Sequence, residues 1–233
     1  MSLLRITHNK NEETFDPFED YHRPDEWKDD SRIDDTAWVE RYKHEAKILE
    51  YRINEHKVKT ILEIGSGPGG LCKHLHDKGA CDGVTYHMVD KAHAKKSHDK
   101  RNWPGEIFVK DLREGVSSEG LLEGYDLIIC NDVLEHLPNP TKVIQDLYYL
   151  NTDKLWVSVP NWRMGHQFFY RGLFDYDNFL YFMRTHRYTG IAINDSPLKT
   201  PYYSKLDSEQ LLPDKYIRSW NWYFLFDKMT QNN

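Results

Sequence analysis

The stretch TILEIGSGPGG, residues 60–70, decides the fold class of this 233-residue chain. Its first part, Thr60 to Ile64, is apolar and β-branched, which predicts a strand. The glycines that follow permit a tight turn and a close approach of the backbone to a ligand. Leu71 to Lys78 then has helical spacing and stops at Gly79, so the helix amino terminus is predicted to face that ligand.

Strand-length apolar runs and helical segments alternate on the carboxyl side of this motif. Apolar residues at helical spacing predict helices over residues 36–53 and 141–150. Alternation of this kind predicts an α/β fold with a doubly wound, mostly parallel sheet of Rossmann-like type. Ligands of such sheets bind beyond the carboxyl ends of the strands. The further predicted strands are Val84 to Val89, Glu106 to Val109, Tyr125 to Cys130 and Leu155 to Val159.

The glycine loop and the acids near it indicate a nucleoside-containing cofactor. Asp90 ends the second predicted strand, twenty residues after Gly70, where a carboxylate can accept both hydroxyl hydrogens of a ribose. Gly65, Gly67 and Gly70 also match the dinucleotide fingerprint, which alone is a weak signal. The acid Glu63 would repel a pyrophosphate and suits a cationic ligand. The chain also has no Tyr-x-x-x-Lys pair, so nicotinamide binding is the less favoured alternative.

These residues carry a resemblance to a known family. Residues 61–69 (ILEIGSGPG) resemble the first motif of the class I S-adenosylmethionine-dependent methyltransferases, and residues 126–140 (DLIICNDVLEHLPNP) resemble their fourth-strand motif. Residues 159–161 and 173–189 are similar to the branch that includes ubiquinone-type O-methyltransferases and methyltransferases of glycan gene clusters. The resemblance covers about residues 36–190 and implies S-adenosyl-L-methionine as the cofactor.

The resemblance also implies a role for individual residues. The glycines of the loop would pass the methionine part of the cofactor, next to the acid that ends the first strand. Asp90 would hold the ribose, and Lys91 would lie beside the adenine. Asp111 and Leu112 would contact the adenine edge, and Asn131 would face the sulfonium side. The cofactor-binding residues are therefore expected to be Glu63, Gly65, Gly67, Gly69, Asp90, Lys91, Asp111, Leu112 and Asn131.

Catalytic candidates follow the fourth strand. Methyl transfer to a hydroxyl needs a positioned acceptor and a group that removes its proton. If a helix begins at Asp132, its spacing puts Asp132, Glu135 and His136 on one side, with His136 as a general base. The same trio is also a candidate site for a divalent cation such as magnesium or calcium, although no metal is our first expectation. His186, in the family-like Thr-His-Arg segment, is a second candidate base.

The absence of certain motifs narrows the range of possible methyl acceptors. No Asn or Asp followed by Pro-Pro and an aromatic residue comes after the fourth strand, and the chain has no Pro-Cys dipeptide. Methylation of DNA bases is therefore disfavoured. An oxygen of a small molecule or glycan is the first expectation, and a nitrogen outside a nucleic acid base is the second. The alternative from another class is a catalytically inert scaffold that binds S-adenosylmethionine and a protein partner.

The chain divides into an acidic arm, residues 1–35, and a methyltransferase domain, residues 36–233. Within the domain, residues 160–190 are rich in aromatic side chains and are predicted to form a lid insertion over the active site. Rings in such a segment either stack on an acceptor or form a satellite core. Residues 191–233 match no motif of the family and are expected to form the carboxyl-terminal edge.

The charge and composition of the chain limit which partners it is expected to bind and in which cellular compartment it is expected to be found. The net charge is −6, and residues 11–35 alone carry −8, so no broad basic face for nucleic acid is expected. The longest stretch without a charged side chain has nine residues, Ile64 to Cys72, which is too short to cross a membrane. The amino terminus lacks the pattern of a signal peptide, and the three cysteines form no disulfide framework. A cytoplasmic location is therefore predicted.

Overall fold

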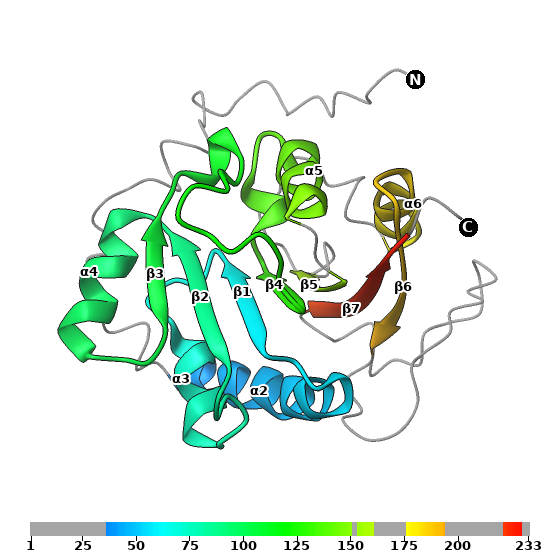
Figure 1. The fold of residues 1–233 in the computed structure, drawn as a ribbon. Coiled ribbons are helices and arrows are strands. Elements are labelled where there is room, and N and C mark those ends of the chain that lie inside the picture. The colour runs from blue at the N-terminus through cyan, green and yellow to red at the C-terminus, as the bar shows by residue number, and fades with distance from the viewer. Residues whose placement is uncertain (1–35, 151–152, 161–175, 194–220, 230–233) are drawn as a thin grey trace, which may run out of the picture.

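A central sheet with helices on both faces makes up the part of the chain that the structure, a computed structural model, describes: residues 36–150, 153–160, 176–193 and 221–229 (Figure 1). The seven strands lie in the order β3-β2-β1-β4-β5-β7-β6. The strands are β1 (Thr60–Ile64), β2 (Thr85–Asp90), β3 (Glu106–Val109), β4 (Leu127–Asn131), β5 (Lys154–Pro160), β6 (Tyr188–Ile193) and β7 (Asn221–Lys228). The helices are α2 (Thr36–His56), α3 (Gly70–Asp77), α4 (Ala92–Arg101), α5 (Pro140–Tyr149) and α6 (Tyr176–Thr185), with 3-10 turns η2 (Leu112–Glu114) and η3 (Leu134–His136).

The sheet is doubly wound and mostly parallel, as predicted. Strand β1 pairs in parallel with β2 on one side and β4 on the other, so the strand order reverses at β1. Strand β7 is antiparallel to both of its neighbours, β5 and β6. The carboxyl ends of β1 and β4 therefore flank the point at which ligands of such sheets bind.

The alternation of side chains along β1 explains why both faces of the sheet are covered. Leu62 and Ile64 point into one apolar cluster, which α5 and α6 complete. Ile61 points into the other, which α2 and α3 complete. Figure 1 shows these helix pairs on opposite sides of the sheet. Burial on both faces is the reason why the parallel strands are apolar almost throughout.

The aromatic residues of the last third belong largely to the core where the structure describes them. Phe179 of α6 packs against Phe224 and Phe226 of β7, with ring centroids 5.1 and 6.1 Å apart. Strand β7 thus gives the carboxyl-terminal region, which matched no family motif, a place inside the sheet. Residues 176–190 of the predicted lid form α6 and part of β6. Residues 161–175, like the acidic arm 1–35, lie outside the described residues.

Helix α4 is the main departure from the predicted elements. Residues 92–101 are helical, although the apolar spacing of the sequence predicted no helix there. Only Ala94 and His98 of this helix are buried, so it lacks the apolar stripe from which helices are predicted. None of the helices in the described part of the chain has the length and apolar character that a membrane crossing requires.

Candidate active site

The glycine loop connects the end of β1 to the start of α3, as predicted. The Gly65 amide donates to the carbonyl of Val89 at 2.8 Å, which ties the loop to the end of β2. Gly69 has a left-handed backbone and stands directly before α3. The amino terminus of α3 is therefore held at the carboxyl ends of β1 and β2, where its backbone amides favour a polar or anionic ligand group.

Gly65 and Gly67 are required in the loop for different reasons. Both have positive φ, +67° and +55°, a conformation that side chains rarely adopt. A Cβ on Gly65 would lie 2.3 Å from Cγ2 of Val133, so Gly65 lets the segment after β4 pack against the loop. A Cβ on Gly67 would meet no atom of the described residues within 4 Å. The Gly67 side of the loop is thus the side that a ligand can approach.

Asp90 fixes the glycine loop as well as ending β2. One carboxylate oxygen accepts from the Gly67 amide at 2.7 Å and the other from the Lys91 amide at 2.6 Å. Burial raises the pKa of Asp90, and these two hydrogen bonds oppose that rise. A carboxylate oxygen can accept two hydrogen bonds, so Asp90 can also accept hydrogen bonds from ribose hydroxyls.

The residues expected at the adenine end lie after β2 and β3. Asp111 caps η2 by accepting from the Arg113 amide at 3.0 Å, and the Arg113 guanidinium also binds its carboxylate. These hydrogen bonds lower the pKa of Asp111 to about 2. Lys91 is partly buried, and burial lowers its pKa while the charge of Asp111 raises it. Leu112 begins η2 and is partly buried. The structure thus brings Lys91 and Asp111 into one charged neighbourhood.

Glu63 is an interior residue. Its side chain is 4% exposed and accepts a hydrogen bond from the Tyr86 hydroxyl at 2.9 Å. Burial raises the pKa of Glu63 to about 8. It therefore has a protein partner beneath the loop, and its own carboxyl group is not exposed to a cationic ligand.

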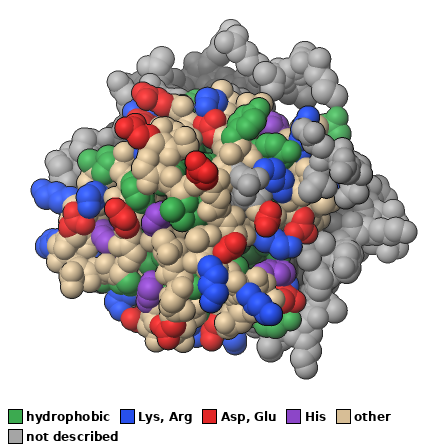
Figure 2. Space-filling view, in the orientation of Figure 1, with side chains coloured by type: hydrophobic (Ala, Val, Ile, Leu, Met, Phe, Trp, Pro, Cys, Tyr) green, Lys and Arg blue, Asp and Glu red, His purple; other side chains and the backbone are tan. Residues whose placement is uncertain are grey.

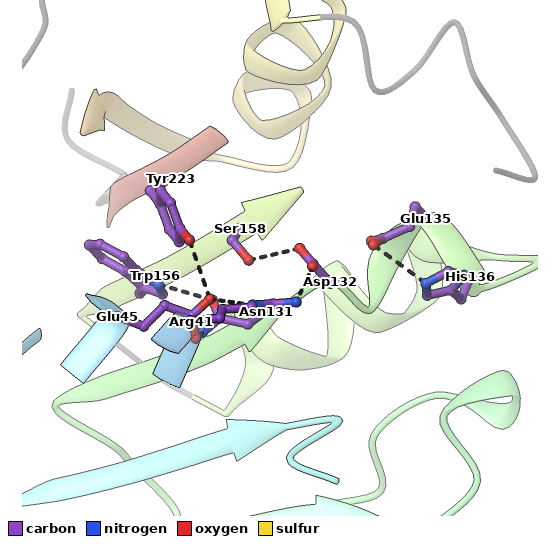
Figure 3. A network of polar contacts seen from close by, with 9 residues as sticks. All are labelled: Arg41, Glu45, Asn131, Asp132, Glu135, His136, Trp156, Ser158 and Tyr223. Carbon is purple, nitrogen blue, oxygen red and sulfur yellow. Dashed lines mark hydrogen bonds and ion pairs between the residues drawn. The ribbon is translucent and has the colours of Figure 1, made fainter. Parts of the chain in front are cut away.

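A buried network of polar side chains lies beside the loop, and most of it was not predicted (Figure 3). Asn131, the last residue of β4, donates to Glu45 of α2 at 3.2 Å and accepts from the Trp156 indole of β5 at 3.0 Å. Glu45 also accepts from Arg41 at 2.8 Å and from the Tyr223 hydroxyl of β7 at 3.4 Å. Four elements that are distant in sequence therefore meet at the predicted sulfonium-side residue, Asn131.

Asp132 extends this network toward solvent. Its carboxylate forms an ion pair with Arg41 at 2.6 Å and accepts from the Ser158 hydroxyl at 2.9 Å. Burial lowers the pKa of Arg41, but the charges of Asp132 and Glu45 outweigh that effect and hold it well above the usual value. Asp132 has a left-handed backbone, with φ +50°. Asp132 and Arg41 are 14% and 21% exposed, so this ion pair is accessible to a ligand.

Glu135 and His136 do not share a face with Asp132, contrary to the helical spacing that was expected. Residues 134–136 form a single 3-10 turn, η3, and Figure 3 shows Asp132 directed to Arg41 and Ser158 while Glu135 and His136 lie apart. The His136 Nε2 atom is 3.5 Å from the buried Glu135 carboxyl. Burial raises the pKa of Glu135 well above its usual value, and the charge of Asp132 raises it further.

The geometry of this turn bears on the cation alternative. Among the described residues, no group of three or more His, Cys, Asp or Glu side chains is arranged to hold a metal ion. Asp132, Glu135 and His136 are accordingly not grouped: Asp132 contacts Arg41 and Ser158, whereas His136 lies beside Glu135.

His186 lies far from the other predicted catalytic residues. It precedes β6, whose first residue, Tyr188, pairs with Lys228 at the end of β7. Because β7 is antiparallel to β5, the end of β7 lies beside Lys154, the first residue of β5. This is the side of the sheet at which the parallel strands begin. The His186 Nδ1 atom is 2.8 Å from the Phe182 carbonyl of α6. His186 therefore lies at the edge of the sheet opposite the glycine loop, and the structure does not bring it to the site.

Arg41 and Glu45 are the residues that the sequence interpretation missed. They are four residues apart on α2, and Glu45 interrupts its buried face beside Ala46 and Leu49. Acidic residues are seldom fully buried unless they are paired, so a Glu on the apolar face of a predicted helix was an available signal. Tyr223 gave no such signal, because it lies in a strand that the sequence did not place.

Comparisons with known proteins agree with this geometry. A family model described as a methyltransferase domain matches residues 38–184. A ubiquinone biosynthesis O-methyltransferase from Glaesserella parasuis serovar 5 (strain SH0165) is 33% identical over 93 residues, which are 37% of this chain and 38% of that protein. The chain therefore matches well under half the length of this relative.

Solved structures show the same fold at low sequence identity. The plantazolicin methyltransferase BamL, in complex with a triazolic desmethylPZN analog and SAH, has a TM-score of 0.66 and 13% identity, covering 90% of this chain and 93% of that one. An S-adenosylmethionine-dependent methyltransferase from Clostridium acetobutylicum ATCC 824 has a TM-score of 0.58 and 10% identity, covering 81% and 92%. With the family match over most of the described core, the chain belongs to the methyltransferase domain family and is an S-adenosylmethionine-dependent methyltransferase.

Proposed function

We propose that this methyltransferase acts on an oxygen of a small molecule or a glycan, with His136 as the general base. One relative, a ubiquinone biosynthesis O-methyltransferase, supports an oxygen acceptor. The structure solved with a desmethylPZN analog supports a small-molecule acceptor without indicating which atom is methylated. The branch of ubiquinone-type and glycan-cluster enzymes is proposed on the same grounds.

The residues present fit the cofactor. No described atom lies within 4 Å of the position that a Cβ on Gly67 would take, so a ligand can approach the loop backbone there. Asp90 would hold the ribose, Lys91 with Asp111 and Leu112 would flank the adenine, and Asn131 with Arg41 would face the methionine end. S-adenosylmethionine supplies, when bound, a methyl group activated by a positively charged sulfur.

The observation that carries the role of His136 is its position relative to the loop. Its amide donates to the Val133 carbonyl at 3.0 Å, and Val133 packs directly against Gly65. The imidazole is 11% exposed and has the Glu135 carboxyl as its neighbour. An imidazole in this place would take up the proton that an acceptor hydroxyl releases. Asp132, another of the predicted catalytic residues, is engaged by Arg41 and is better suited to orient a ligand.

The distribution of charge does not favour a nucleic acid as the acceptor. Figure 2 shows acidic and basic side chains interspersed over the visible face, without a continuous basic patch. The cytoplasm remains the proposed location, and the three cysteines are free and buried in the structure. No protein partner is proposed.

A screen of acceptor pools with labelled S-adenosylmethionine tests this function. Phenolic, hydroxylated and glycan pools should accept label, and amine pools should not. The linkage in the product, found by mass spectrometry, distinguishes an oxygen from a nitrogen acceptor. Transfer to amines alone would overturn the oxygen assignment. Cofactor binding without transfer to any pool would favour the inert scaffold that the sequence left as an alternative.

A further inference from the structure

Glu45 is a buried acid whose cost to the fold calls for an explanation. Its side chain is 1% exposed on helix α2, and it lies among apolar residues of the core. Removing a carboxylate from water is strongly unfavourable unless its oxygens are hydrogen-bonded. Glu45 meets this requirement with donors from three separate elements: Arg41 of α2, Asn131 of β4 and Tyr223 of β7.

Glu45 fixes the orientation of the Asn131 amide. The indole nitrogen of Trp156 can only donate, so the oxygen of the amide must face it. The amide nitrogen then points to the Glu45 carboxylate, which accepts. Replacing Glu45 with a group that also donates would remove one of the two contacts that prevent this amide from flipping.

Glu45 also fixes the direction of the Arg41 guanidinium. The Nε atom of Arg41 is held by Glu45 at 2.8 Å, while its Nη1 atom reaches Asp132 at 2.6 Å. The guanidinium is planar, so fixing one nitrogen sets the plane in which the others donate. The contact with Glu45 therefore sets the direction from which the Arg41 guanidinium can meet a ligand carboxylate.

We propose that Glu45 is a positioning residue for the amino-acid end of the cofactor, acting through Arg41 and Asn131. This assignment rests on the proposed function, because it takes S-adenosylmethionine to lie between the glycine loop and Asn131. The amino-acid end carries a carboxylate and an ammonium group, and the network presents a guanidinium and an acid, Asp132, to match them. The Tyr223 hydroxyl of β7 donates to Glu45, so β7 also helps to hold Glu45 in position.

Binding of two ligands distinguishes a positioning role of Glu45 from a general structural role. S-adenosylhomocysteine carries the amino-acid end, whereas 5′-methylthioadenosine has the same adenosine and sulfur without it. The dissociation constants of both are measured by calorimetry for the wild type and for Glu45→Gln, with thermal unfolding as a check on folding. The matched control is Glu50→Gln, because Glu50 is on the same helix but is 37% exposed and only 3.5 Å from a surface lysine, Lys78.

The expected result is a selective loss. Glu45→Gln should weaken S-adenosylhomocysteine by about 10-fold or more, as expected when hydrogen bonds to charged groups are lost. It should leave 5′-methylthioadenosine unchanged, and Glu50→Gln should change neither ligand. Equal weakening of both ligands, or no weakening of either, would overturn the assignment. A wild type that binds neither ligand would instead overturn the proposed cofactor site.

Tyr223→Phe decides the question if Glu45→Gln does not fold. It removes one donor to Glu45 and keeps the ring, which packs 5.7 Å from Trp156. A smaller loss, about threefold, is expected for S-adenosylhomocysteine alone, because a single hydrogen bond is removed. An equal effect on both ligands, or none, would again count against the positioning role.

Discussion

At the scale of single residues, Asp90 has a double role that makes its replacement informative. It holds the Gly67 amide at 2.7 Å in addition to its proposed contact with the ribose. Asp90→Ala should therefore weaken S-adenosylhomocysteine by roughly 2 to 3 kcal/mol, and Asp90→Asn by less, because its amide oxygen still accepts. Calorimetry measures both, with Asp99→Asn on the exposed side of α4 as the control. An unchanged affinity in folded Asp90→Ala would remove Asp90 from the site.

Glu63 should make the protein less stable as the pH rises. Its folded pKa, about 8, is above the usual value of 4.5, so the folded state holds one more proton than the unfolded state between these values. Each pH unit in that window should lower the free energy of unfolding by about 1.4 kcal/mol through this residue. Urea unfolding at pH 5 and pH 7 should show a flatter dependence for Glu63→Gln, which keeps an acceptor for Tyr86. Equal slopes for wild type and variant would contradict the prediction.

The role of His136 can be separated from cofactor binding. His136→Ala should lower turnover of the acceptor found by screening by roughly 100-fold or more, with the affinity for S-adenosylhomocysteine unchanged. A chelator should have no effect, because the structure separates Asp132 from Glu135 and His136 (Figure 3). Inhibition by a chelator that magnesium reverses would revive the cation alternative. Full activity of His136→Ala would leave positioning as the source of catalysis.

At the scale of elements, the glycine loop provides a matched pair of substitutions. Gly67→Ala adds a methyl group on the side open to a ligand, so it should fold with only backbone strain of about 1 to 2 kcal/mol and lose cofactor binding. Gly65→Ala should be destabilised by a further 1 to 3 kcal/mol, approximately, because its methyl group would overlap Val133. Thermal unfolding and calorimetry measure the two effects. Tight binding by Gly67→Ala would place the cofactor elsewhere.

The elements that the sequence predicted are those with a strong local signal. The sequence predicted β1, the glycine loop and Asp90 because their signals are local. These signals are an apolar run, the glycines of a tight turn and the short distance along the chain to Asp90. Helix α4 was missed because its burial involves only Ala94 and His98. The Glu45 network joins residues up to 178 positions apart, and no local pattern encodes such a contact. The turn at Asp132 was misjudged because a left-handed backbone replaced the helix that spacing alone suggested.

At the scale of the whole molecule, β7 should be indispensable for folding. It lies inside the sheet between β5 and β6, and its Phe224 and Phe226 are 0% and 1% exposed. Removing residues 221–233 would expose the facing edges of β5 and β6 and part of the core under α6. Circular dichroism should show loss of cooperative unfolding in that truncation. Removal of residues 230–233 alone, as the control, should be tolerated, and a cooperative fold in both truncations would contradict this account.

The place of β7 also has a consequence for synthesis on the ribosome. Of the described strands, β7 is the last to leave the exit tunnel, yet it occupies an interior position in the sheet. Until it arrives, β6 has no described neighbour to pair with, and β5 has an open edge. Contacts that join distant parts of a chain form slowly, so a nascent chain stalled at this stage would be exposed to chaperones and proteases. Tyr223 is in the same strand, and its hydrogen bond to Glu45 therefore makes completion of the proposed cofactor site depend on translation through β7.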